Sequence, residues 1–316
     1  MFRRADRAAW LRWTTVPATV GAVTLAGVNA KAAEAYTPVD CRSTPSALRT
    51  AIAAAAPGAT LSVRGRCVGP FTIGKSLTVV GRGQAVLDGN HTGTTVTIGG
   101  AAHVRLTRLT VTGGQGSRGG GILNTDGTLT VSRSTVTGNA SNSTGGGIRN
   151  QGTLTVELTS VHHNTARTLG GGLDNVGPSG RLTVVRSTVH HNTAATVNGG
   201  GIFNDATARV DFSVISDNTA PVGSGGGIRD TGADGRLTLN GTLVRDNRAA
   251  GAGGGVSVGA RATATLNDSQ VRNNSAGTAG GGINVGGGAV TVNRTRVAGN
   301  VPNDCAPTGA VPGCIG

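Results

Sequence analysis

The chain has 316 residues, of which 55 are glycine and only seven are aromatic, and its net charge is +13 from 28 Lys and Arg against 15 Asp and Glu. Glycine shows no three-residue period, which excludes collagen. A hydrophobic content of 37% is too high for a disordered chain and too low for a protein with many membrane spans. The core must therefore be built from many small, regularly placed Val, Ile, Leu and Thr.

The N-terminal segment has the pattern of a secretory signal. Four arginines precede a modestly apolar stretch over 14–28, which is too short to span a bilayer, and small residues follow it. We predict a signal peptide over 1–35 with cleavage at about 30–35, and a secreted protein without a membrane span after cleavage. An N-terminal membrane anchor is the alternative. Removing 1–32 leaves 23 basic and 14 acidic residues, or +9.

Residues 36–58 are expected to form an N-terminal cap with a short helix. Thr44 is placed as the N-cap, Pro45 as the first helical residue, and an Ala-rich helix runs to Ala56 before Pro57-Gly58 ends it. The cysteines lie as one pair near each end of the chain. For an exported protein we expect the disulfides Cys41–Cys67 and Cys305–Cys314, although three pairings are formally possible.

A repeat governs the region between the two cysteine pairs. Triple-glycine units followed by an aliphatic residue recur 25 to 29 residues apart, beginning at Gly119, Gly145, Gly170, Gly199, Gly225, Gly253 and Gly280. Between them recur an aliphatic-x-x-Asn unit and a Leu-Thr-Val or similar triplet. Each period thus holds three short β-type segments separated by turn residues, and none is long enough for a helix.

A period near 26 residues with three strands fits one coil of a parallel β-helix. We predict an all-β, single-stranded, right-handed parallel β-helix over 59–304, with about nine or ten coils. A disulfide-tied C-terminal cap over 305–316 follows it. The caps are needed because an open end would expose strand edges and apolar core.

The glycine run and the x-x-Asn unit over 119–300 resemble the repeats of polymorphic outer membrane proteins, with Val or Ile in place of the Phe of that pattern. More widely, residues 40–304 resemble secreted parallel β-helix proteins of the pectin-lyase-like superfamily. That resemblance implies the fold. The superfamily includes polysaccharide lyases, glycoside hydrolases and adhesins, so it does not by itself imply one activity.

The asparagines of the x-x-Asn unit are predicted to stack in one column, because an amide both donates and accepts hydrogen bonds and Asn tolerates a left-handed turn. We interpret this column as structural. Its members are Asn139, Asn164, Asn192, Asn218, Asn247, Asn274 and Asn300. A shorter column of Asn124, Asn150, Asn175, Asn204 and Asp230 follows the glycine runs and is interpreted in the same way.

The two positions inside each x-x pair should point outward, which would place four histidines beside Asp217 and Asp246. Side chains in adjacent coils would lie about 5 Å apart. His163, His191 and Asp217 are therefore metal-ligand candidates, and Asp217 and Asp246 are candidates for acid–base catalysis. The alternative is a solvated corner made by duplicated Thr-Val-His-His-Asn units.

We expect a secreted, monomeric β-solenoid without a cofactor that binds or decorates an extracellular surface or an anionic polysaccharide. Nucleic acid is disfavoured because few aromatic residues are available for base stacking. Few acids and no long loops argue against a built catalytic groove, so we lean against an enzyme. The alternative is a polysaccharide lyase or glycoside hydrolase of the pectate-lyase-like type, with calcium if it is a lyase.

Overall fold

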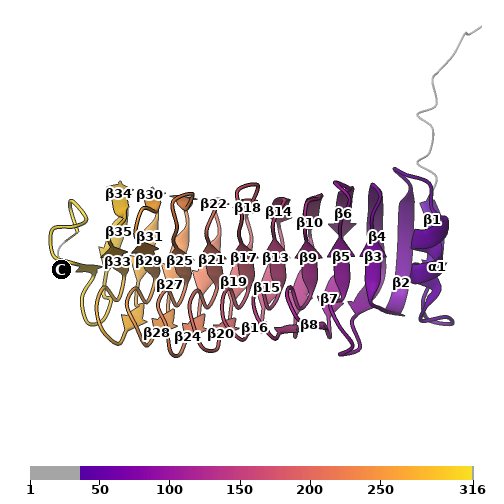
Figure 1. Cartoon of the computed structure of the whole chain (residues 1–316), viewed down its shortest axis with the longest axis horizontal. Helices are drawn as coiled ribbons and strands as arrows, with labels where there is room; N and C mark the ends of the chain where they lie inside the picture. The colour runs from indigo at the N-terminus through magenta and orange to yellow at the C-terminus, as the bar shows by residue number, and fades with distance from the viewer. Residues whose placement is uncertain (1–35, 315–316) are drawn as a thin grey trace, which may run out of the picture. The chain divides into compact units, whose positions relative to one another are not determined.

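The strands of this protein stack side by side as a parallel β-helix. The computed structural model describes residues 36–314, so the predicted signal segment lies outside the described residues. Every pairing between named strands is parallel, and each coil pairs with the next one along the axis. The winding is right-handed and gives residues 36–314 the form of an elongated stack of coils (Figure 1). The predicted fold class is confirmed.

The first stack contains ten short strands, which sets the number of coils at about ten. They are β3 (Phe71–Ile73), β5 (Val96–Ile98), β9 (Ile122–Asn124), β13 (Ile148–Asn150), β17 (Leu173–Asn175), β21 (Ile202–Asn204), β25 (Ile228–Asp230), β29 (Val256–Gly259), β33 (Ile283–Gly286) and β36 (Cys305–Ala306).

The second stack contains the five-residue strands. They are β6 (His103–Thr107), β10 (Thr128–Ser132), β14 (Thr153–Glu157), β18 (Arg181–Val185), β22 (Thr207–Asp211), β26 (Arg236–Asn240), β30 (Thr263–Asn267) and β34 (Ala289–Asn293). Near the N-terminus, β1 (Tyr36–Asp40) pairs with the long strand β2 (Thr60–Val68), and β2 pairs with β4 (Leu77–Asp88). Because β4 pairs with both β6 and β7, it runs through the second and third stacks without a break.

The third stack contains three-residue strands, and a fourth stack of two-residue strands follows it. The third consists of β7 (Thr110–Thr112), β11 (Thr135–Thr137), β15 (Ser160–His162), β19 (Thr188–His190), β23 (Val214–Ser216), β27 (Leu243–Arg245), β31 (Gln270–Arg272) and β35 (Arg296–Ala298). The fourth consists of β8 (Gln115–Gly116), β12 (Ala140–Ser141), β16 (Thr165–Ala166), β20 (Thr193–Ala194), β24 (Thr219–Ala220), β28 (Arg248–Ala249) and β32 (Ser275–Ala276). Each regular coil thus carries the three expected strands and one short additional strand.

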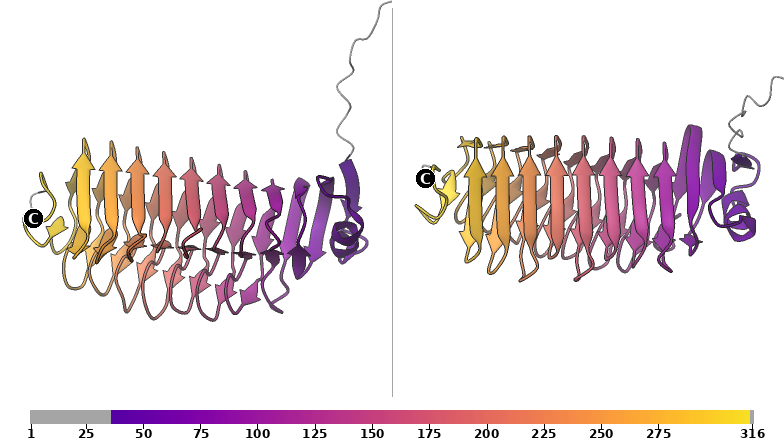
Figure 2. Two further views of the ribbon diagram at one scale, coloured as in Figure 1. Left: turned by 45° about the horizontal axis from the view of Figure 1, so that its top comes forward. Right: turned by 90° about the horizontal axis from the view of Figure 1, so that it is seen from above.

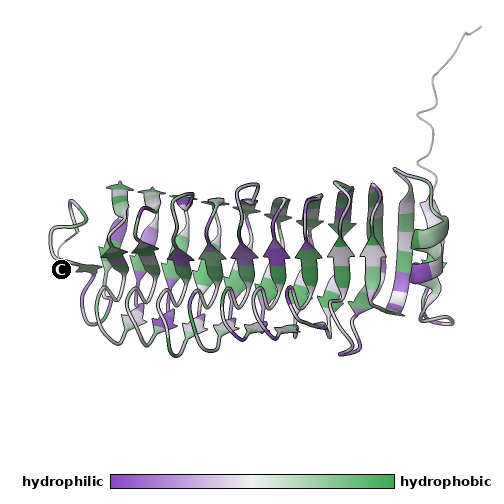
Figure 3. Cartoon of the chain, in the orientation of Figure 1, coloured by the Kyte–Doolittle hydropathy of each residue, from purple (hydrophilic) through white to green (hydrophobic). Residues whose placement is uncertain are grey.

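Alternation along the strands builds the core. In β10, Leu129 and Val131 point inward and are fully buried, whereas Thr128 points outward and is exposed. The strands lie side by side along the solenoid (Figure 2). The register places Leu129 against Leu154 and Val131 against Val156, so like residues stack from coil to coil. Burying each such side chain contributes about 1.5–3 kcal/mol. Apolar bands therefore run the length of the solenoid (Figure 3).

The N-terminal end is covered by helix α1 (Ala47–Ala54), which buries Leu48 and Ile52. The predicted N-cap at Thr44 is wrong, because the helix begins after Ser46 and no side chain caps it. The cause is the Thr44-Pro45 turn: the Thr44 carbonyl accepts the Ala47 N–H and the Pro45 carbonyl accepts the Val68 N–H. This turn is tied to β2, so the helix starts later. It also ends two residues before the predicted Ala56.

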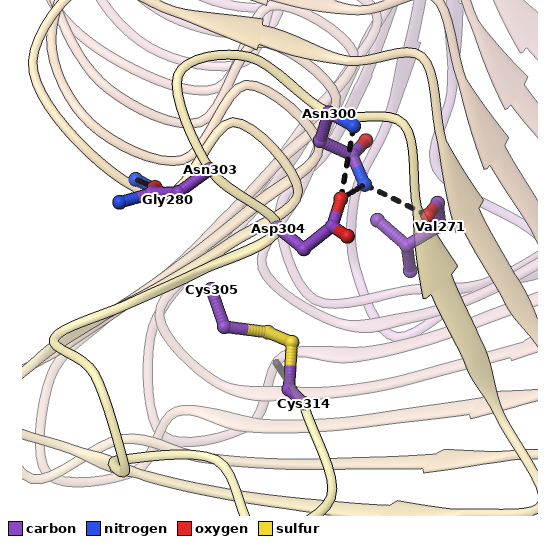
Figure 4. Close-up of a disulfide and its surroundings, with 7 residues drawn as sticks. All are labelled: Val271, Gly280, Asn300, Asn303, Asp304, Cys305 and Cys314. Carbon is purple, nitrogen blue, oxygen red and sulfur yellow. Dashed lines mark hydrogen bonds between the residues drawn. A yellow bond between two sulfur atoms is a disulfide. The ribbon is translucent and has the colours of Figure 1, made fainter. Parts of the chain in front are cut away.

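Both ends carry the expected disulfides, Cys41–Cys67 and Cys305–Cys314. At the C-terminal end, Asp304 Oδ1 accepts the backbone N–H of Asn300 at 2.9 Å and its side-chain amide at 2.8 Å (Figure 4). Asp304 thereby occupies the place that the next coil's asparagine would fill. Within residues 36–314, no helix combines the length and apolar character needed to cross a membrane.

The seven asparagines of the x-x-Asn units form one buried ladder in the structure. The first six side-chain amides each donate to the Oδ1 of the next asparagine at 2.9–3.0 Å, and the amide of Asn300 donates to Asp304. The same Oδ1 atoms accept a backbone N–H of the preceding coil. The amide also donates to a backbone carbonyl one coil back, as Asn192 does to Val161. The ladder thus satisfies backbone groups that the turn removes from the strand pairings.

A second buried column lies at the corner between the second and third stacks, and the sequence analysis missed it. Its hydroxyls donate to the carbonyl two residues earlier, and six of the seven accept an N–H from the preceding coil. The members are Ser134, Thr159, Ser187, Ser213, Thr242, Ser269 and Thr295. The signal was a Ser or Thr two residues before the aliphatic residue of each x-x-Asn unit.

Replacing Asn192 by Ala should lower the free energy of unfolding by about 3–5 kcal/mol, because the two N–H groups donated by Asn164 and the Val161 carbonyl all lose a buried partner. Guanidinium denaturation followed by circular dichroism measures the loss. The control is Asn142→Ala at an exposed position, which should change stability by less than about 0.5 kcal/mol. Equal effects of the two substitutions would show that the ladder does not stabilise the coil.

Candidate functional site

A column of left-handed residues follows the third stack and carries the histidine and aspartate candidates. Gly138, His163, His191, Asp217, Asp246, Asn273 and Gly299 occupy equivalent positions, and each has a positive φ between 52° and 72°. Gly, Asn, Asp and His are the residues that adopt this conformation most readily. The backbone of the corner therefore restricts which residues can appear in this column.

Four histidines form a compact array on two adjacent coils. The rings of His162 and His190 stack with centroids 4.8 Å apart, and those of His163 and His191 stack at 5.1 Å. Within each coil the two rings are perpendicular, and their Nδ1 atoms lie 2.7 Å apart in His162–His163 and 2.8 Å apart in His190–His191. The array thus consists of two Nδ1 pairs, one above the other.

The surroundings of the two inner rings, His162 and His190, favour the neutral imidazole. Partial burial lowers the pKa of His162 and of His190, and the neighbouring imidazoles lower both further. Hydroxyl groups lie beside the inner rings, with Thr137 Oγ1 3.1 Å from His162 Nδ1 and Ser160 Oγ 3.1 Å from His190 Nε2. His163 and His191 are exposed, so solutes reach the outer side of the array.

The two aspartates of the column have different surroundings. Asp217 follows His191 by one coil, and its charge partly offsets the lowering of the His190 pKa. Asp246 forms an ion pair with Arg245, and both side chains are about one-third exposed. Asp246 is thus part of a charged surface pair. A catalytic role for Asp217 and Asp246 stays a prediction.

Among residues 36–314, no three His, Cys, Asp or Glu side chains converge as they would around a metal ion. The set His163, His191 and Asp217 is spread over three coils, and the two imidazoles in it face one another as stacked rings. The closest nitrogen atoms belong instead to consecutive residues of one coil, a pairing that the sequence analysis did not anticipate.

Exposed arginines lie at the corner between the second and third stacks in the N-terminal coils. Arg64, Arg82, Arg108 and Arg133 lie at the same corner of four successive coils, and all four are exposed; we call them the arginine edge. Adjacent coils are spaced about 4.8 Å apart. None of the four forms an ion pair with a carboxylate of the described residues.

Shallow hollows separate the guanidinium groups of this edge. One hollow is lined by Arg42, Arg64 and Arg82 together with Gly83 and Gln84. The next is lined by Arg108 and Arg133 together with residues 83–86, 109–110 and 134–135. Neither lining includes a carboxylate. The arrangement is therefore suited to a chain of anions lying along the edge.

Two further aspartates, Asp174 and Asp230, are buried on different coils of the first stack. Asp174 is paired with Arg149, and Asp230 accepts the Asn204 amide at 2.6 Å. Burial raises the pKa of Asp174 to about 6 and that of Asp230 to about 7, although Arg149 and Arg229 oppose the shifts. Both aspartates are 0–1% exposed. They cannot contact a polymer, so their shifted pKa values reflect burial in the scaffold.

The comparisons with known proteins add little to this description. No protein-family model matches the chain, and no curated protein matches it. Among solved structures, the chain is similar to "Crystal structure of pectate lyase Pel9A" with 16% identity, covering 76% of this chain and 72% of that one, with a TM-score of 0.46. The assignment of the parallel β-helix rests on this chain's own strand pairings, and the likeness to polymorphic outer membrane protein repeats stays a prediction.

Replacing Asp230 by Asn should stabilise the protein at alkaline pH. The pKa of Asp230 is raised from 3.8 to about 7 in the folded state, so its protonated form favours folding: this contribution is complete below about pH 3.8 and is lost as the pH rises through about 7. An amide would extend the column of Asn124 to Asn204 without a buried charge. We expect a gain of about 2–4 kcal/mol at pH 8.5.

Denaturation midpoints of wild type and variant at pH 4.5 and 8.5 measure this effect. The two proteins should differ little at pH 4.5, where Asp230 is already protonated. Asp126→Asn at an exposed position serves as the control and should be neutral at both pH values. A D230N protein that is less stable than wild type at pH 8.5 would show that the buried carboxylate is stabilised by its surroundings.

Proposed function

We propose that this protein is an exported, non-catalytic β-solenoid that binds an anionic polymer, with an acidic polysaccharide as the preferred class. The observation that supports this proposal is the arginine edge. Four exposed arginines that form no ion pair lie on consecutive coils, and adjacent coils are about 4.8 Å apart. A linear polymer that carries one negative charge per sugar or per pair of sugars matches such a row in both charge and form.

The overall charge favours the same class of ligand. Residues 36–314 contain 23 Lys and Arg against 13 Asp and Glu, a net charge of +10, so the surface attracts polyanions before contact. Nucleic acid is the less favoured polyanion because the described residues offer few exposed rings for stacking. Phe71 and Phe203 are buried, and the Tyr36 ring lies under Arg82, with 5.2 Å between the guanidinium carbon and the ring centroid. Phe212 is exposed, but a single ring on one coil makes no stacking platform for successive bases.

Export agrees with the use of cysteine. All four cysteines are joined in disulfides, one at each end of the coil stack, and such bonds persist in oxidising compartments. A secreted polysaccharide lyase is the competing function, and it would need calcium and a base near its substrate. The binding experiment below distinguishes the two, because a lyase would shorten the polymer.

Replacing Arg108 and Arg133 together by Asn should weaken binding to polygalacturonate or alginate about five- to thirtyfold at low salt, since each surface guanidinium contributes roughly 0.5–1 kcal/mol. Asn suits these sites because both residues have a left-handed backbone, with φ of 56° and 50°. Affinity is measured by biolayer interferometry at two or more salt concentrations. The variant should also show a weaker salt dependence.

Arg294→Asn is the matched control. It removes one positive charge, half the change made by the double variant, from the same left-handed corner in the last coil, where Arg294 is already paired with Asp268. It should leave affinity nearly unchanged. A loss of binding free energy half as large as that of the double variant would show that binding follows net charge and not the edge. Unsaturated sugar ends absorbing in the ultraviolet, formed with added calcium, would replace the binding proposal with that of a lyase.

A further inference from the structure

We propose that the histidine array binds two tetragonal divalent transition-metal ions, copper(II) most tightly, with one ion held by His162–His163 and a second by His190–His191. The donors are the two Nδ1 atoms of each pair. This site is separate from the proposed polymer-binding edge, which lies at the opposite corner of the third stack. Failure of one proposal therefore leaves the other in place.

The distance within each pair selects the coordination geometry. Imidazole nitrogens bind such ions at about 2.0–2.1 Å. Two donors 2.7 or 2.8 Å apart then subtend about 80–90° at a shared ion. This is the angle between adjacent ligands in square-planar or tetragonal sites, which copper(II) and nickel(II) prefer. A tetrahedral zinc site would need the nitrogens about 3.3 Å apart.

The left-handed corner makes this pairing possible. On an ordinary strand, consecutive side chains point to opposite faces, so neighbouring histidines do not meet. Here His162 ends β15 and His163 has a φ of 52°, which turns its ring back toward its neighbour. His190 and His191 repeat the arrangement one coil later. The Nδ1 atoms of two consecutive histidines are thereby brought close enough to bind one ion.

Each pair can present both of its Nδ1 atoms to an ion after the shift of a single hydrogen. Without metal, one Nδ1 of each pair donates a hydrogen to the other. When an ion binds, this hydrogen moves to Nε2 of the same ring, so both Nδ1 atoms bind the ion and the charge of the rings is unchanged. Water completes each coordination sphere.

The neighbouring coils limit the number of ions. The coil before the array has Thr137 and Gly138 at these positions, and the coil after it has Ser216 and Asp217. Neither supplies a second imidazole pair. Two ions on adjacent coils would lie about 5 Å apart, close enough for their unpaired electrons to interact.

Isothermal titration of the protein with copper(II) in a non-coordinating buffer, together with electron paramagnetic resonance, tests the proposal. We expect two equivalents per chain, nitrogen hyperfine structure, and dipolar broadening when both sites are filled. Nickel(II) should bind more tightly than zinc(II). The variants H162T/H163N and H190S/H191N should each lose one equivalent and the dipolar broadening, and the fourfold variant should lose both equivalents.

These substitutions copy residues that the repeat itself uses in the same register, Thr137, Ser216 and Asn273, so the coils should remain folded. Circular dichroism checks this point. The control is H91N/H103T, which removes the other two histidines of the chain, and it should still bind two equivalents. Copper binding that is unchanged in the fourfold variant would overturn the proposal. So would a wild-type protein that binds a single equivalent which either double variant abolishes, because one ion would then be shared by both pairs.

Discussion

The structure depends on satisfying buried backbone groups at the corners of each coil. Where the chain turns between two stacks, peptide groups leave the strand pairings but remain inside the solenoid, where an unpaired group costs about 1–3 kcal/mol. The asparagine ladder supplies hydrogen-bond partners at the corner after the third stack. The serine–threonine column supplies them at the corner between the second and third stacks. Because each side chain bonds to the coil above and below, the coils are held in one register. The flat outer surfaces and their regular spacing follow from that register.

The same corners determine what the surface can offer to a ligand. Inward positions hold mainly aliphatic residues, corner amides and corner hydroxyls, so the chain varies its chemistry chiefly at outward positions. The column that follows the third stack is restricted further, to residues that accept a positive φ. Histidine and aspartate satisfy the backbone there and also bring donor atoms. Two requirements, one of folding and one of chemistry, are thus met by the same residues.

The sequence predicted features that repeat with fixed spacing and missed those that depend on side-chain direction. The amide column could be predicted because an asparagine stands at the same place in every period, and the end cysteines because each pair lies close in sequence. The pairing of His162 with His163 could not, since it arises from a ring turned back at a left-handed residue. The arginine edge was missed because Arg64 and Arg82 precede the regular repeat. Only the register of β2 and β4 brings them to the corner of Arg108, because Val63 pairs with Gly81 and Val80 pairs with Thr107.

The corner before the third stack carries different side chains on one backbone conformation. Eight residues occupy this corner in successive coils, and all of them have a positive φ: Arg108, Arg133, Leu158, Arg186, Phe212, Gly241, Asp268 and Arg294. A positive φ costs about 1–2 kcal/mol for a residue with a Cβ, so the corner bears this cost whichever side chain it carries. Neither the fold nor the core requires an exposed guanidinium there. It is therefore the charge of Arg108 and Arg133 on adjacent coils, and not their backbone, that supports contact with a polyanion.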